Sequence, residues 1–162
     1  PTLLTTTAGT GKAVALTFDD GPDPRWTPRI LDILAAADAR ATFFVLRDHV
    51  LAHPELVRRA ADAGHEIGVH GYSHENPIAM TRQQETEILD YCTDLIERRS
   101  GTKPVGYVAP WWEFSKVTNE ILLERGSSTT TRSCTMTTPR TTCVWGTAGR
   151  RSTTRPRRRT SG

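Results

Sequence analysis

Short runs of β-branched and aromatic residues alternate with longer amphipathic stretches between Ala13 and Gly126, and this alternation constrains the fold most strongly. Parallel strands need a long return connection, usually a helix, so the pattern is typical of βα units. It predicts strands at 13–18, 41–46, 66–70 and 104–108. We therefore expect an α/β fold with a parallel sheet, whose four units amount to about half of the eight in a closed barrel.

Helix signals separate these strands. Thr27 is predicted to cap the first helix, with Pro28 in its first turn. Thr81 and Gln84 fit a capping box. Helices are expected to begin near Thr27, Pro54, Thr81 and Ser115, and the last three to end at Gly64, Gly101 and Gly126.

Residues 127–162 differ in composition from the rest of the chain. They hold 12 Thr, 5 Ser, 8 Arg and no acid, whereas residues 1–126 carry 13 Lys and Arg against 18 Asp and Glu. Apolar residues do not recur at a helix or strand period in this segment, so it cannot form a packed core and a disordered tail is expected. A second interpretation is a shifted reading frame near Ser127, because threonine codons read one base earlier encode Tyr, His, Asn or Asp. The predicted organisation is an N-terminal segment (1–12), one domain (13–126) and the tail.

Charge and composition exclude several classes of protein. Residues 1–126 carry a net negative charge, which does not favour binding to the phosphates of nucleic acid. Nucleic acid is therefore not expected as a partner. No stretch approaches the roughly 18 apolar residues of a membrane span, and Pro1–Leu4 lacks the pattern of a signal peptide. Cys92 falls in a helical pattern and Cys134 and Cys143 fall in the tail, which implies neither a metal cluster nor a disulfide framework.

Conspicuous polar and aromatic residues stand at or just after the ends of three predicted strands. They are Asp19–Asp20, His70 and Trp111–Trp112–Glu113. In parallel α/β folds the active site assembles at the carboxyl ends of the strands. We therefore expect the chemistry of this chain at that edge of the sheet.

Two short motifs carry most of the chemical signal. Asp19–Pro22 is compatible with a plain turn, but adjacent carboxylates also allow one to bind a cation while the other acts as a base. His70 and His74 are four residues apart with Gly71 allowing a tight turn, which favours a metal over a purely structural role. Two histidines and one aspartate suit Zn²⁺ and leave a position open for water.

The segment Thr17–Pro22, followed by the His70/His74 pair, resembles the polysaccharide deacetylases of carbohydrate esterase family 4, the NodB-homology domain. The resemblance covers about residues 13–126, and Gly106–Trp111 resembles a third family motif. It implies a partial, deformed (β/α) barrel and a metal-dependent hydrolase that removes acetyl groups from amino sugars or acetylated glycans. Carried over by position, it implies Asp19 as the catalytic base and Asp20, His70 and His74 as ligands of a divalent metal, with zinc expected.

The sequence departs from the family pattern in two respects. The family has an arginine that orients the base where this chain has Val108. Its later motifs, including a histidine that supplies the general acid, would fall in the tail or beyond it. No residue is therefore assigned as the acid, and we expect the chain as written to be a poor catalyst.

The remaining candidate residues allow more than one interpretation. Pro110, Trp111 and Trp112 are candidates for substrate binding, although a tryptophan pair after a buried strand is equally compatible with the core. Phe43 and Phe44 are expected in the core, and Glu113 as a solvated loop charge. Three further histidines lack a matching ligand spacing and are expected at the surface or as capping groups: His49, His53 and His65.

Two alternatives to glycan deacetylation stay open. Residues 109–115 look more like family members that act on peptidoglycan-like or cyclic imide and ureide substrates than like chitin or xylan enzymes, so a small cyclic amide is a second substrate class. A degraded domain that binds metal or glycan without turnover is favoured by Val108. We expect an extracellular or cell-envelope location for a glycan deacetylase and a cytoplasmic one for an imide hydrolase. Unpaired strand edges make self-association a further expectation.

Overall fold

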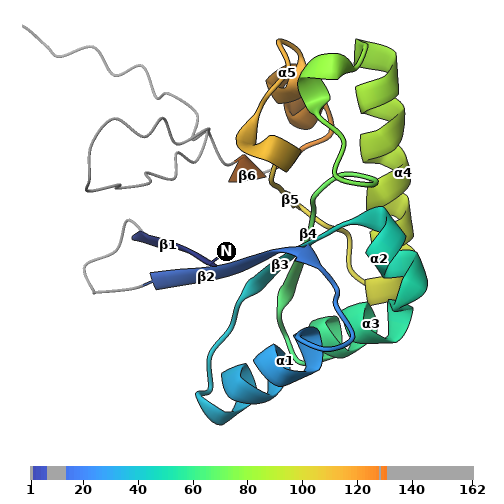
Figure 1. Cartoon of the computed structure of the whole chain (residues 1–162). Coiled ribbons are helices and arrows are strands. Elements are labelled where there is room, and N and C mark those ends of the chain that lie inside the picture. Colours follow the sequence, from blue (N-terminus) through green and yellow to red (C-terminus); the bar gives the residue numbers. More distant parts are fainter. Residues whose placement is uncertain (1, 7–13, 128, 131–162) are drawn as a thin grey trace, which may run out of the picture.

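The computed structural model describes residues 2–6, 14–127 and 129–130, and its centre is one six-stranded sheet. The strands pair in the order of the sequence, so each is the neighbour of the next (Figure 1). Strand β1 is antiparallel to β2, and every later pair is parallel. The strands are β1 (Thr2–Thr6), β2 (Val14–Gly21), β3 (Thr42–Val45), β4 (Glu66–Val69), β5 (Gly106–Tyr107) and β6 (Thr129–Thr130). This arrangement confirms the expected α/β class.

Helices connect the parallel strands, and α1 to α4 lie along the lower and right-hand sides of the sheet in Figure 1. Their apolar faces and the sheet form one core that includes Phe43. Phe44 is buried as well, as expected for both residues. None of the helices in the described part of the chain is both long and apolar enough to cross a membrane. The helices are α1 (Thr27–Ala36), α2 (Arg47–Ala52), α3 (Pro54–Asp62), α4 (Arg82–Ser100) and α5 (Thr118–Glu124), with 3₁₀ turns η1 (Pro77–Ala79) and η2 (Pro110–Trp112).

Two segments extend the sheet beyond the predicted domain boundaries. Thr2–Thr6, expected to lie in a separate N-terminal segment, pairs with β2 as strand β1. Thr129–Thr130, expected to lie in the tail, pairs with β5 as strand β6. The expectations for residues 128 and 131–162, including the shifted reading frame, lie outside the described residues.

The helix boundaries follow local signals, with two corrections. The capping box of Thr81 and Gln84 is present, and Gly101 ends α4 with a left-handed backbone. Trp26 rather than Thr27 is the N-cap of α1, because the Thr27 hydroxyl accepts the backbone N–H of Asp23 instead. Helix α5 begins at Thr118, whose N–H donates to the Ser115 hydroxyl oxygen.

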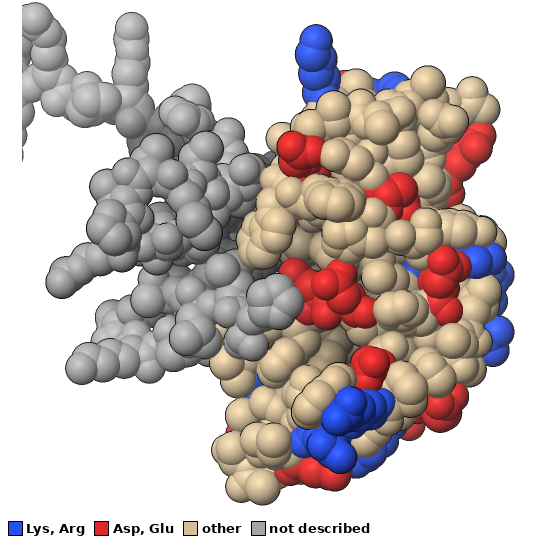
Figure 2. All heavy atoms as spheres, in the orientation of Figure 1, with Lys and Arg blue, Asp and Glu red and all other residues tan. Residues whose placement is uncertain are grey.

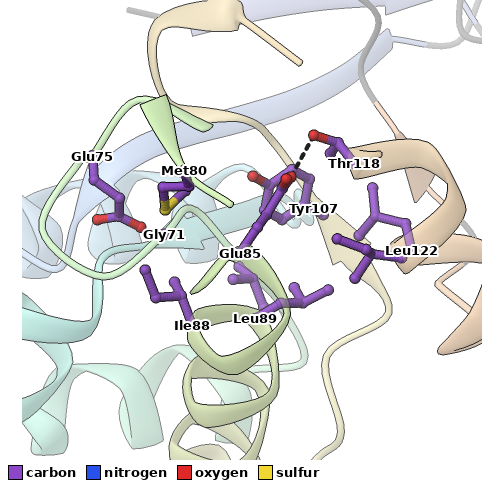
Figure 3. A pocket seen from close by; sticks show the side chains of 11 residues that line it. Gly71, Glu75, Met80, Glu85, Ile88, Leu89, Tyr107, Thr118 and Leu122 are labelled. Carbon is purple, nitrogen blue, oxygen red and sulfur yellow. Dashed lines mark hydrogen bonds between the residues drawn. The ribbon is translucent and has the colours of Figure 1, made fainter. Parts of the chain in front are cut away.

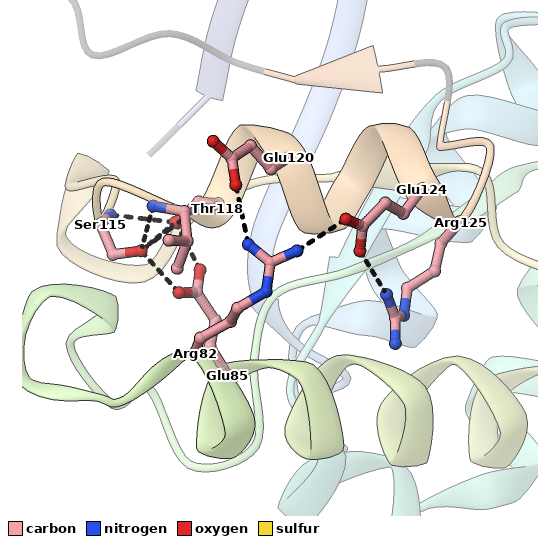
Figure 4. Close-up of polar contacts among 8 residues, drawn as sticks. Arg82, Glu85, Ser115, Thr118, Glu120, Glu124 and Arg125 are labelled. Atoms are coloured by element: carbon pink, nitrogen blue, oxygen red, sulfur yellow. Dashed lines mark hydrogen bonds and ion pairs between the residues drawn. The ribbon is translucent and has the colours of Figure 1, made fainter.

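Polar contacts attach α5 to the start of α4 (Figure 4). Arg82 donates to Glu120 at 2.8 Å and to Glu124 at 2.6 Å. The buried carboxylate of Glu85 accepts hydrogen bonds from the hydroxyls of Ser115 and Thr118. Both of its oxygens therefore have hydrogen-bond partners although the residue is shielded from water. These contacts fix the segment that leads from the end of β5 into α5.

A cavity of about 10 Å³ lies between α4 and the end of β4 and is drawn in Figure 3. The carboxylates of Glu75 and Glu85 line it together with apolar side chains such as Met80 and Leu89. A volume of this size holds about one water molecule. This cavity is too small for a substrate.

Gly68 lies in the middle of β4, where two neighbouring strands leave no room for a side chain. A Cβ at this position would overlap the ring of Phe44 and lie 3.1 Å from the carbonyl oxygen of Gly106. The missing side chain therefore lets the Phe44 ring lie against the backbone of the sheet.

We predict that Gly68→Ala destabilises the fold by roughly 1–3 kcal/mol, because the added methyl group overpacks the core. Denaturant unfolding measures this change in free energy. Gly21→Ala is the matched control, since a Cβ there meets no atom closer than 3.9 Å, and its cost should be about 0.5 kcal/mol or less. Equal stabilities of Gly68→Ala and the parent would contradict the packing argument.

Candidate metal centre

Three of the sequence-predicted residues converge at the carboxyl ends of β2 and β4. The Nε2 atoms of His70 and His74 lie 3.3 and 3.5 Å from Oδ1 of Asp20. All three candidate ligand atoms lie within 4.8 Å of one another. His70 is buried, His74 is partly buried and Asp20 is exposed, so the cluster opens to solvent on one side.

A bulge in β2 explains how the side chains of two adjacent aspartates can lie on the same side of the strand. Successive side chains of a regular strand point to opposite faces. The register between β2 and β3 shifts after Phe18, so that three steps along β2 match two along β3. Asp20 lies in this irregularity with a φ of 66°. The bulge therefore redirects the Asp20 carboxylate toward the two histidines.

The ring of His70 is oriented by Val108, the residue that follows β5. Its Nδ1 lies 2.7 Å from the carbonyl oxygen of Val108, which only accepts hydrogen bonds, so Nδ1 must carry the proton. In the neutral imidazole the other nitrogen, Nε2, then carries no hydrogen, and it faces Asp20. A histidine held through one ring nitrogen in this way is the usual arrangement for a metal ligand.

The loop after β4 turns back on itself and brings His74 beside His70. Gly71 has a φ of 94°, and a Cβ there would lie 2.9 Å from both Glu75 and Pro110. The Glu75 carboxylate accepts the backbone N–H groups of Tyr72 and Ser73 at 2.8 and 2.7 Å. These contacts fix the loop, and the two imidazole rings meet edge to face with centroids 5.3 Å apart.

Helix α2 and the residue before it hold both of the loops that carry candidate ligands. The N–H of Leu46 donates to the carbonyl of Gly21 at 2.9 Å, and Nδ1 of His49 donates to the carbonyl of Asp20 at 2.7 Å. On the other loop, the N–H groups of Arg47 and Asp48 donate to the carbonyls of Gly71 and Tyr72. The relative position of Asp20 and the histidines thus depends on this one short segment.

Asp19 lies next to the cluster, and one of its oxygens is isolated. Among the described residues, its buried Oδ1 has no hydrogen-bond partner. Burial raises the pKa of Asp19 above its ordinary value, His70 acts in the opposite direction, and Asp20 adds to the increase. Val108, in the place of the family's arginine, is buried and offers no side-chain donor.

Trp111 lies beside His74, and Trp112 follows it in the exposed turn, so the two are termed here the aromatic wall. Their side chains are 60% and 36% exposed, so they are not part of the core. The Nε1–H of Trp111 donates to the carbonyl of His74 at 3.0 Å, and the two rings meet edge to face. Pro110 is buried beneath them against Gly71, so only the tryptophans offer a surface to a substrate.

Strained backbone is concentrated at this centre. Asp20, His74, Trp111 and Trp112 all have φ between 61° and 66°, a region that residues other than glycine rarely adopt. Such conformations persist where surrounding contacts hold them, and they cluster at functional sites. The backbone therefore supports the same location that the side chains indicate.

The sequence patterns did not indicate the contacts of three side chains in this region, His49, Glu113 and Glu75, and they misplaced His65, which lies before β4. His49 was expected at the surface, and it is exposed, but its ring holds the backbone of Asp20. Glu113 is exposed as expected and also accepts a hydrogen bond from Asn76. His65 was expected at the surface or as a cap, and it is instead buried, where Nδ1 accepts the N–H of Ala41. Glu75 stands one residue after His74, and nothing in its local sequence indicates its role.

Comparison with known proteins identifies relatives that are similar in sequence. The sequence profile of a family described as polysaccharide deacetylase matches residues 6–129. The chain is 48% identical over 99 residues to a peptidoglycan deacetylase of Helicobacter pylori, a match that covers 61% of this chain and 34% of that protein. The chain thus spans about a third of the length of this curated relative.

Two solved structures share the fold over about half of their own length. One is a peptidoglycan N-acetylglucosamine deacetylase in complex with a naphthalenyl N-hydroxybenzamide, with a TM-score of 0.67 and 34% identity, covering 69% of this chain and 52% of the other. The second is a family 4 acetyl xylan esterase from Clostridium thermocellum in complex with a cobalt ion. Its TM-score is 0.63 at 34% identity, covering 66% of this chain and 53% of that chain.

We predict that His49→Ala lowers the affinity of the centre for a divalent cation by about 10- to 100-fold, because Asp20 loses the hydrogen bond that holds its backbone. Titration calorimetry with zinc measures the affinity. His49→Asn, which keeps a side-chain N–H, should retain most of it. His53→Ala is the control, since His53 lies at the junction of α2 and α3 and contacts Glu55. Unchanged affinity in His49→Ala would refute the role of this hydrogen bond.

Proposed function

The chain belongs to the polysaccharide deacetylase family, and from this premise we propose that it hydrolyses the N-acetyl groups of an acetylated glycan. The observation that supports this most directly is the convergence of Asp20, His70 and His74 beside the isolated carboxylate of Asp19. Relatives named as deacetylases of peptidoglycan, and a neighbour named as an acetyl xylan esterase, favour a glycan over a cyclic imide or ureide.

The donor set fits a divalent cation. One carboxylate and two imidazole Nε2 atoms lie close to one another. The proton on Nδ1 of His70 is hydrogen-bonded to the carbonyl of Val108 and leaves the Nε2 side to a cation. We propose zinc, because this combination of ligands is common for it and leaves room for water. When bound, such a cation polarises an acyl oxygen and makes water more acidic.

Asp19 is the proposed general base. Its carboxylate is adjacent to Asp20 in the sequence, and Asp19 is only partly buried. Since no donor among the described residues engages its Oδ1, we propose that this carboxylate accepts a proton from the attacking water. Attack on the acetyl carbon breaks the C–N bond and leaves an amine that has to gain a proton. We assign this proton donor to no side chain of the described residues.

Trp111 and Trp112 are the proposed contacts to the sugar. Both side chains are exposed, and an indole face suits the apolar face of a pyranose ring. The link from Trp111 to the carbonyl of His74 places this surface directly beside the candidate metal ligands. An acetylated sugar lying on the tryptophans would therefore present its amide to Asp19.

Location and assembly follow as further proposals. Relatives that are named for peptidoglycan support action at the cell envelope or outside the cell. Within the described sheet, β1 and β6 each pair on one side only, and such edges favour self-association. A second candidate function is a domain that binds metal and glycan without turnover, which the isolated Oδ1 of Asp19 and the apolar Val108 favour.

We predict that Asp19→Asn lowers acetate release from an N-acetylated glycan by about 10²- to 10⁴-fold while zinc binding stays, because only the base is removed. His74→Ala should lose both zinc binding and acetate release. Acetate detection and calorimetry on the same preparations separate the two effects. Acetate release that persists at the parent rate in Asp19→Asn would remove Asp19 from the mechanism, and no release by the parent chain would favour the binding domain.

We predict that Val108→Arg raises acetate release by less than about tenfold. A charge-assisted hydrogen bond to Asp19 would contribute about 1.5–3 kcal/mol, and the cost of burying a guanidinium offsets much of this gain. Val108→Met is the matched control, because it lengthens the side chain without a charge. An equal increase in Val108→Met would show that the charge is not responsible.

A further inference from the structure

An exposed tryptophan follows the Asp19–Asp20 motif in the loop between β2 and α1. The Trp26 side chain is 51% exposed, although it is large and apolar. The guanidinium carbons of Arg25 and Arg29 lie 4.9 and 5.4 Å from the centroid of its ring. These three residues, termed here the Trp26 patch, combine one aromatic face with two positive charges.

The backbone of the Trp26 patch is held in place before any ligand arrives. One carboxylate oxygen of Asp23 accepts the N–H groups of Arg25 and Trp26 at 2.8 and 2.7 Å. The N–H of Asp23 donates to the Thr27 hydroxyl at 2.9 Å. A surface that is ordered in advance loses less conformational entropy when it binds a ligand.

The two arginines of the patch are not used to balance charge within the fold. Within residues 14–127, Arg25 and Arg29 form no salt bridge, whereas Arg58 pairs with Asp62 and Arg59 with Asp32. Residues 1–126 carry more acidic than basic groups, so two arginines without an acidic partner beside one indole ring are unusual in this part of the chain. Each guanidinium keeps N–H groups that can donate to an anion.

The patch lies within reach of the candidate metal centre. Trp26 is six residues from Asp20, which limits their separation to about 20 Å even for an extended chain. In Figure 2, Lys and Arg side chains gather low on the face that is shown, where Figure 1 places α1, and acidic side chains gather near its middle. A glycan of a few sugars would cover a separation of up to about 20 Å.

We propose that the Trp26 patch is a subsite for a carboxylate-bearing sugar of the glycan chain, away from the acetyl group that is hydrolysed. This inference rests on the proposed glycan substrate. The part of the Trp26 ring that the two guanidinium groups leave exposed contacts the sugar ring. The guanidinium groups donate to the carboxylate, for which their planar geometry is well suited. The subsite selects an acidic glycan over a neutral one.

The test compares two tetrasaccharides with the same N-acetylated backbone. One is chitotetraose, and the other alternates N-acetylglucosamine with N-acetylmuramic acid and so adds lactyl carboxylates. Binding to the full chain is measured by calorimetry and by tryptophan fluorescence after chelation of metal, so that no acetyl group is lost. We expect the acidic probe to bind about tenfold more tightly at low salt and the difference to shrink as salt is added.

Substitutions assign the preference to the patch. Arg25→Gln with Arg29→Gln should abolish the preference and leave chitotetraose binding unchanged, whereas Trp26→Ala should weaken both probes. Arg58→Gln with Arg98→Gln is the matched control, because it removes the same charge from two exposed arginines that pair within α3 and α4. Equal affinities for the two probes, or a preference that survives in the Arg25/Arg29 variant, would overturn the subsite.

Acetate release by the metal-loaded parent chain is measured in parallel. A preference for the acidic probe without acetate release would refute the proposed activity and leave the subsite standing. Acetate release without the preference would refute the subsite alone.

Discussion

Hydrogen bonds from one short segment, Leu46–His49, determine whether the candidate ligands can meet. Asp20 comes from the end of β2 and the histidines from the end of β4, and β3 lies between these strands. The segment follows β3 directly and donates to carbonyls on both sides, at Asp20 and Gly21 and at Gly71 and Tyr72. The middle strand thus provides the scaffold for ligands that it does not itself carry.

The contacts around the candidate metal centre also hold strained backbone in place. An aspartate, a histidine and two tryptophans with left-handed backbone would each relax if the surrounding contacts were lost. The isolated Oδ1 of Asp19 adds a second cost, because a buried carboxylate oxygen without a partner is unfavourable. A fold that keeps several unfavourable features in one place gives up stability there, as sites of chemistry commonly do.

Much of the fold could be predicted because its signals are local. The strand expected at 41–46 is observed as Thr42–Val45, and the capping box at Thr81 lies entirely within a few residues. Helix α2 was not predicted, because its six residues are too few to show a period and Leu46 gives no side-chain cap. The sequence pattern also placed Asp20, His70 and His74 together. It could not indicate the β2 bulge or the contact of His49 with Asp20, because these depend on strands that are adjacent only after folding.

The hydrogen bond from the Trp111 indole to the carbonyl of His74 joins the exposed aromatic wall to the loop that carries two candidate ligands. If the proposed sugar shifts the Trp111 ring, this hydrogen bond transmits the shift to His74, and the free energies of binding sugar and cation are then linked. Linkage of this kind is reciprocal, so the factor by which the cation changes sugar affinity equals the factor by which the sugar changes cation affinity. Cation affinity measured without glycan then describes only one of the four sides of the thermodynamic cycle.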